Sequence, residues 1–97
     1  MKTMTKNITS ITPVHLPDLH FIQFCEKEFN VNRGIYNTID TWFFNYGIKN
    51  LLERRQTIIY FLQNLNEIRK KNNTTKIKFG SGGLTSSLTE FCQTNHL

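Results

Sequence analysis

Apolar residues recur at three- and four-residue intervals from Ile48 to Ile68, and this spacing constrains the fold more than any other feature of the chain. It is the period of one face of an α-helix. Two shorter segments share it, one from Asp18 to Phe29 and one from Asn32 to Tyr46. The sequence therefore predicts a mainly α protein with helices over residues 17–30, 33–46 and 48–71.

The residues between these segments predict where the helices begin and end. Pro17 suits a first helical turn, where its missing N–H would be unpaired anyway. Asn32 can cap the second helix, and Gly47 can end it in a left-handed conformation, although a kinked continuous helix is an alternative. Arg55 and Arg69 interrupt the apolar face of the third helix, which disfavours a long coiled coil.

The last segment is shorter, and it predicts a fourth helix that contains Leu88, Phe91 and Cys92. Ser87 and Glu90 have the spacing of a capping box, which places the start of this helix late. We expect a mobile tail over residues 1–12 and a single helical domain over residues 13–97. That domain should be a small bundle of three to four helices around Trp42, with a short strand near 76–79 as an open alternative.

Several functional classes lack support in the sequence. No run of 18 apolar residues and no secretory signal is present, so we expect a soluble protein, cytoplasmic or otherwise intracellular, with no membrane partner. Cys25 and Cys92 each lie among apolar residues, where reduced thiols pack well, and two cysteines form no disulfide framework.

Catalytic and cofactor-binding patterns are also missing. The three histidines are scattered, and the spacing of Cys92 and His96 supplies only half of a zinc site, so we expect no metal and no enzyme. The glycine-rich stretch FGSGG, residues 79–83, lacks the Lys and Ser/Thr of a phosphate-binding P-loop, so no nucleotide cofactor is expected.

The stretch VNRGIYNTIDTWFF, residues 31–44, raises the question of a helix-turn-helix module. Its linker has five residues, and the helix that would read DNA contains Asp40, no Lys or Arg, and several large apolar side chains. A groove-reading helix is normally polar or basic and follows a turn of three or four residues. This helix is therefore expected to fill the core.

Four aromatic residues within residues 42–46 cannot all face inward, because successive residues of a helix are rotated by about 100°. Trp42 and Phe43 can share the inner face while Phe44 points outward. Outward aromatics of this kind are enriched in protein interfaces. Our first interpretation is a small non-catalytic interaction protein, acting as a regulator or inhibitor of a protein partner through Phe44, Tyr46 and Tyr60. A homodimer and a viral or mobile-element origin stay open.

The net charge of +5 supports a second interpretation. Five basic residues lie within ten positions that contain no acid, namely Arg69, Lys70, Lys71, Lys76 and Lys78, while the other seven basic residues balance seven acidic ones. Cations at the end of a helix can complement its dipole and keep the domain soluble. They can also bind phosphates, so the alternative function is binding of an RNA or DNA backbone through residues 69–83.

Overall fold

The computed structural model describes residues 13–71, 73 and 83–97, and in these residues the chain is helical, as the sequence predicts. A short 3-10 helix η1 (Pro13–His15) precedes the α-helices, which are α1 (Asp18–Phe29), α2 (Arg33–Tyr46), α3 (Leu51–Lys71) and α4 (Gly83–Thr94). The expected N-terminal tail and the expected strand near 76–79 lie outside the described residues.

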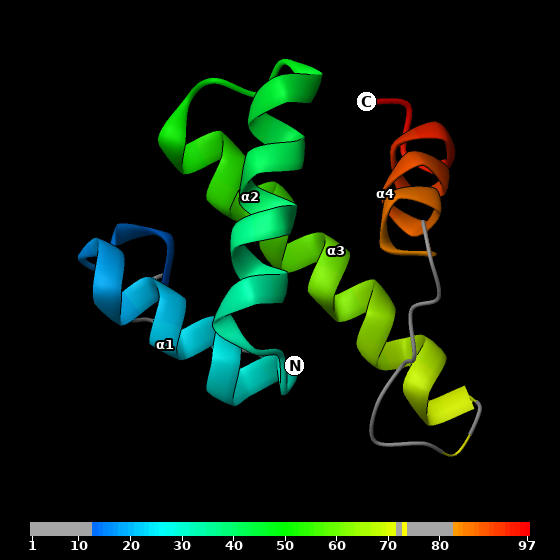
Figure 1. Ribbon diagram of the computed structural model, residues 1–97, viewed down its shortest axis with the longest axis horizontal. Coiled ribbons are helices and arrows are strands. Elements are labelled where there is room, and N and C mark those ends of the chain that lie inside the picture. The colour runs from blue at the N-terminus through cyan, green and yellow to red at the C-terminus, as the bar shows by residue number, and fades with distance from the viewer. Residues whose placement is uncertain (1–12, 72, 74–82) are drawn as a thin grey trace, which may run out of the picture.

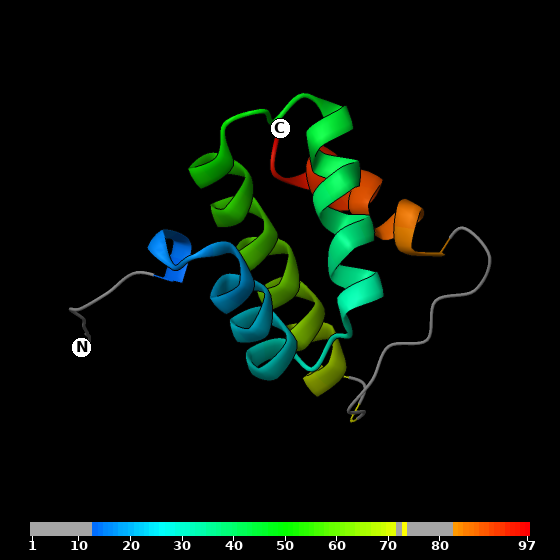
Figure 2. The same ribbon diagram turned by 60° about the vertical axis from the view of Figure 1, so that its left-hand side comes forward.

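The helices form a bundle with α3 at its centre (Figure 1). Helices α1 and α3 run in the same direction, and α2 packs across both of them in the opposite direction (Figure 2). Helix α4 lies on the far side of α3 from α1 (Figure 1). None of the helices in the described part of the chain has the length and hydropathy that crossing a membrane would need.

Aromatic rings form the centre of the core. Phe21, Phe43 and Phe61 are completely buried. Phe91 of α4 meets Phe43 and Phe61 edge to face, at ring-centroid distances of 6.2 and 5.4 Å. The prediction that Trp42 lies at the centre is wrong: Phe43 takes the inward position on α2, and Trp42 is half-buried beside it.

The ends of α2 agree with the sequence. The side chain of Asn32 accepts a hydrogen bond of 2.8 Å from the backbone N–H of Ile35, which confirms the predicted cap. Gly47 has a φ of 130° and ends the helix, so the alternative of one kinked helix is wrong.

Two other helix starts differ from the predictions. The side chain of Asn50 accepts a hydrogen bond from the backbone N–H of Glu53, so α3 begins at Leu51 and not at Ile48. Helix α4 begins at Gly83, which places Ser87 and Glu90 inside the helix rather than at its start. The capping-box spacing was therefore misleading, because the same spacing also occurs along a helix interior.

Two buried arginines of α3 attach α1 at both of its ends. Arg55 donates hydrogen bonds of 2.9 and 2.7 Å to the carbonyl oxygens of Val14 and Leu16, just before α1 begins. Arg69 donates to the carbonyl oxygens of Phe29 and Asn30, where α1 ends. Both arginines therefore belong to the packing of α1 on α3, although from the sequence they only interrupt the apolar face.

Candidate nucleic-acid interface

The last turn of α3 contains the first three residues of the predicted basic segment, and they differ in role. Arg69 is buried, and Asn66 accepts a further hydrogen bond of 3.0 Å from its guanidinium. Burial lowers the pKa of Arg69 below its usual range. Lys70 and Lys71 are exposed, whereas Lys76 and Lys78 lie outside the described residues. The structure therefore gives Arg69 contacts inside the protein and leaves Lys70 and Lys71 on its surface.

The inward position of Arg69 fixes the directions of its two neighbours. Each residue of a helix is rotated by about 100° from the one before, so Lys70 and Lys71 leave the helix on different sides. Lys70 lines a groove beside α3, and its Nζ lies 3.6 Å from a carboxylate oxygen of Glu67. Both side chains of this ion pair are about three-quarters exposed, so the pair is worth little and leaves Lys70 able to bind other anions.

Two further basic residues come from helices that meet at the same end of the bundle. Lys27 lies in the last turn of α1, and Arg33 is the first residue of α2. Arg69, in the last turn of α3, contacts the end of α1, and α2 begins at this same end of the bundle, toward the bottom of Figure 2. We call Lys27, Arg33, Lys70 and Lys71 the basic end. Lys27 and Arg33 have no basic neighbour within five residues in the sequence, and only the fold brings the ends of their helices to the same end of the bundle as the last turn of α3.

The basic end also contains acids. Arg33 forms an exposed ion pair of 3.3 Å with Glu26, and Glu67 lies beside Lys70. Lys71 has no ion pair with any other described residue. The positive potential here is thus moderate, and Lys27 and Lys71 are the two of these four basic residues that form no ion pair within the described part of the chain.

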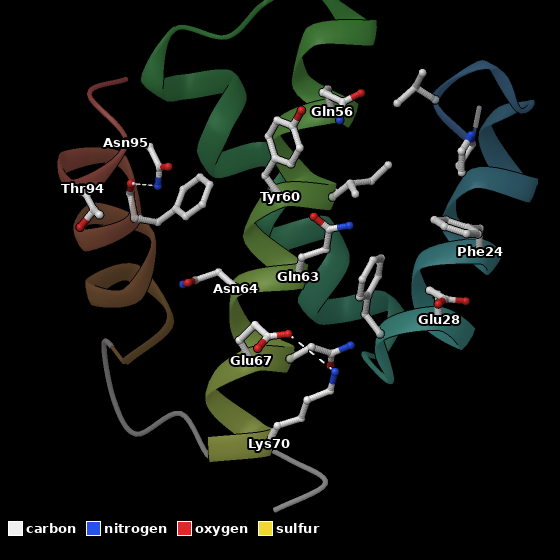
Figure 3. A pocket seen from close by; sticks show the side chains of 16 residues that line it. Phe24, Glu28, Gln56, Tyr60, Gln63, Asn64, Glu67, Lys70, Thr94 and Asn95 are labelled. Atoms are coloured by element: carbon white, nitrogen blue, oxygen red, sulfur yellow. Dashed lines mark hydrogen bonds and ion pairs between the residues drawn. The ribbon is translucent and has the colours of Figure 1, made fainter. Parts of the chain in front are cut away.

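A groove with a volume of about 990 Å³ begins beside the basic end and runs along α3. Its floor is one exposed face of α3, and its walls come from α1 and α4 (Figure 3). The residues that α3 places on this face include Gln56, Tyr60, Gln63, Asn64, Glu67 and Lys70. They recur every three or four positions, so they share one side of the helix.

The three aromatics of the predicted partner surface do not come together. Phe44 has the Nζ of Lys49 3.8 Å from its ring centroid. Tyr46 stacks on Trp42 at a centroid distance of 5.2 Å and donates a hydrogen bond to the carbonyl oxygen of Leu97. Tyr60 is 55% exposed and lines the groove instead. Among the described residues, none of these three rings contacts another, and their role as a partner surface stays a prediction.

The two thiols are poor candidates for nucleophiles. Cys25 and Cys92 are buried and form no disulfide. Burial raises the pKa of Cys25 to about 12, and it also raises the pKa of Cys92. The thiolate is the reactive form, so both groups stay protonated and inert near neutral pH. Within residues 13–71, 73 and 83–97, no three side chains of the metal-binding types form a cluster.

The chain is similar to a curated protein from Bacillus subtilis (strain 168), the RNA-binding riboflavin kinase RibR. The two sequences are 43% identical over 86 residues, which cover 89% of this chain. The same residues correspond to 37% of that relative, so the chain spans little more than a third of its length. No protein-family model matches the chain, and no solved structure matches it either.

This similarity contradicts our first interpretation of the sequence. The chain was interpreted as a regulator or inhibitor that binds a protein partner, whereas the name of the relative describes binding to RNA. The second interpretation, a nucleic-acid binder, agrees better with the similarity.

Proposed function

We propose that this chain binds RNA, with the basic end as the part of its surface that contacts phosphates. The observation that carries the proposal is the 43% identity, over most of this chain, to a relative described as RNA-binding. The relative is also described as a kinase, but the chain spans only 37% of it. The proposal therefore takes up the RNA-binding part of the description.

Lys70 and Lys71 are the described residues best suited to phosphate contacts. Both are exposed, and they lie at the end of α3 from which the chain continues toward Lys76 and Lys78. Lysine ammonium groups bind phosphates as point charges and release counterions when they do so. We keep Lys76 and Lys78 as predicted phosphate contacts on the sequence alone, and we leave out Arg69 because its guanidinium is occupied inside the protein.

Salt dependence of RNA binding tests this proposal. We expect Lys71→Gln to weaken binding to every RNA sequence alike and to reduce the log–log salt slope by about 0.7, the value for one phosphate contact of a single strand. A variant with Gln at positions 70, 71, 76 and 78 should reduce the slope by up to about 3 units. Fluorescence anisotropy at several salt concentrations gives both slopes.

Lys49→Gln is the matched control for Lys71→Gln. Lys49 is also an exposed lysine, but it precedes the start of α3, about 30 Å from the last turn of that helix at 1.5 Å per residue. The control should leave the slope unchanged. If Lys49→Gln and Lys71→Gln reduce the salt slope equally, RNA binding responds only to net charge and the basic end is not the contact surface. Wild-type protein that binds no RNA at low salt would refute the proposal as a whole.

We also propose that this chain has no kinase activity of its own. A kinase needs a site that holds the nucleotide phosphates, and the glycine-rich stretch at residues 79–83 lacks the Lys and Ser/Thr of a phosphate-binding P-loop. Incubation of the chain with riboflavin and a nucleoside triphosphate should give no phosphorylated product. Turnover above the rate of a mock preparation would refute this part of the proposal.

A further inference from the structure

The floor of the groove combines polar amide side chains with an exposed aromatic ring. Gln63 and Asn64 present amide groups, and Tyr60 between the two helical walls is more than half exposed. Figure 3 marks two interactions among the residues that line the groove, Asn95 with the carbonyl oxygen of Phe91 and Lys70 with Glu67. The amides of Gln63 and Asn64 take part in neither. They form no hydrogen bond with any other described residue, so their donors and acceptors are open to the groove.

The charges of the groove argue against a phosphate backbone inside it. Glu28 on the α1 side and Glu67 on the floor are acidic, and Lys70 at one end is basic. These charges sum to a slightly negative groove, in which phosphates would be repelled. An apolar peptide would fit no better, because it would bury the amides of Gln63 and Asn64 without hydrogen-bond partners.

An uncharged, flat group with polar edges avoids both problems. It is not repelled by the acidic residues, and it can pair with the amides of Gln63 and Asn64. A nucleobase has a π-face that stacks on an aromatic ring, and edge atoms that both donate and accept hydrogen bonds, as amide side chains do. Its phosphates lie on the opposite side from its edge, so they can remain outside the groove. The groove volume of about 990 Å³ lies within the range of ligand sites.

We propose that this groove receives unpaired RNA bases, with Tyr60 stacking on a base and the amides of Gln63 and Asn64 bonding to base edges. The inference rests on the proposed function, which it extends from phosphate binding to recognition of single-stranded RNA. Lys70 connects the two surfaces, because it lines the groove and belongs to the basic end. When the bases of an RNA strand enter the groove, Lys70 therefore lies beside the phosphate backbone at the end where the strand leaves the groove.

The test compares Tyr60→Ala, Tyr60→Phe and Phe44→Ala in binding to a mixed-sequence single-stranded RNA of about a dozen nucleotides. Removal of one base–aromatic stack should weaken binding of Tyr60→Ala roughly 5- to 150-fold. Tyr60→Phe keeps the ring and should stay within about threefold of wild type. Phe44→Ala removes another exposed ring, 43% exposed against 55% for Tyr60, that lies outside the groove, and it should have no effect.

Two further measurements separate the groove from the basic end. Tyr60→Ala should leave the salt slope unchanged, and it should not weaken binding to the same RNA with abasic sites in place of its bases. A Tyr60→Ala variant that binds single-stranded RNA as tightly as wild type would overturn the groove proposal. Weaker RNA binding by Lys71→Gln in the same assay would still support the proposed function. Wild-type protein with no affinity for RNA would overturn both. Far-UV circular dichroism verifies folding, which an exposed Tyr→Ala change on a helix should preserve.

Discussion

Substitution of Arg55 tests which contacts hold α1 on α3. Its two kinds of partner, backbone carbonyls and a carboxylate, are expected to contribute different energies. Its guanidinium donates to the carbonyl oxygens of Val14 and Leu16 and forms an ion pair with Asp18. The Asp18 side chain is 86% exposed, whereas the Val14 carbonyl bond is buried. Because water reaches the Asp18 carboxylate, this part-buried ion pair contributes about 1 kcal/mol or less, whereas a hydrogen bond from a charged donor to a buried carbonyl contributes about 1.5–3 kcal/mol.

The magnitude for Arg55→Met follows from these contacts. The buried carbonyl of Val14 would lose its partner entirely, while water can partly replace the donor at the more accessible carbonyl of Leu16. The methionine keeps apolar contact with Phe21, whose ring centroid lies 4.7 Å from the guanidinium carbon. We therefore expect Arg55→Met to lower the free energy of unfolding by about 2–4 kcal/mol. Asp18→Asn should lower it by less than about 1 kcal/mol.

Urea unfolding followed by far-UV circular dichroism measures both changes. For a domain of this size, the loss in Arg55→Met corresponds to a fall in Tm of roughly 10–25 °C. Arg55→Lys keeps the charge but lacks the guanidinium fork, so it should recover only part of the loss. If Asp18→Asn costs as much as Arg55→Met, the ion pair and not the carbonyl bonds holds α1, and the reasoning fails.

The remaining predictions concern the end of α2 and the buried ionisable groups. Gly47→Ala should destabilise the protein by about 1–3 kcal/mol in urea unfolding, because a φ of 130° strains any residue that has a Cβ. The strain is in the backbone, since no atom lies within 4 Å of the added Cβ. An unchanged stability would show that the turn relaxes. The contribution of Cys25 and Tyr36 to stability should be constant below pH 9 and fall between pH 9 and 12, because burial raises the pKa of Cys25 from 9.0 to about 12 and also raises the pKa of Tyr36, so the unfolded chain ionises first. The fall should be shallower in Cys25→Ala, and an equally steep fall in that variant would contradict the assignment to Cys25.

The helices could be predicted because their evidence is local in the sequence. Apolar spacing, the cap at Asn32 and the turn at Gly47 act within a few residues, and each has the expected effect in the structure. The failures also have local causes. Trp42 and Phe43 are equally plausible core residues from spacing alone, and only the packing of α1, α3 and α4 decides that Phe43 is buried.

The candidate site was only partly predictable, because its residues meet through distant contacts. Arg69 resembles its lysine neighbours in sequence, but its carbonyl partners lie about 40 residues earlier in the chain. Tyr60 was assigned to a surface of outward aromatics, and the groove around it depends on where α1 and α4 lie against α3. The amides at positions 63 and 64, at helical spacing from Tyr60, are the signal in the sequence that marks this face of α3.

The two walls of the groove are held by different forces, which makes them unequal in mechanical terms. Directional hydrogen bonds from Arg55 and Arg69 fix α1 on α3. Helix α4 packs on the core through the apolar side chains of Leu88, Phe91 and Cys92, and the carbonyl oxygen of Leu97 just after it accepts a hydrogen bond from Tyr46. Apolar contacts tolerate sliding that hydrogen bonds do not. We therefore expect the α1 wall of the groove to be rigid and the α4 wall to shift more easily. The width of the groove then depends on the position of α4 on the core.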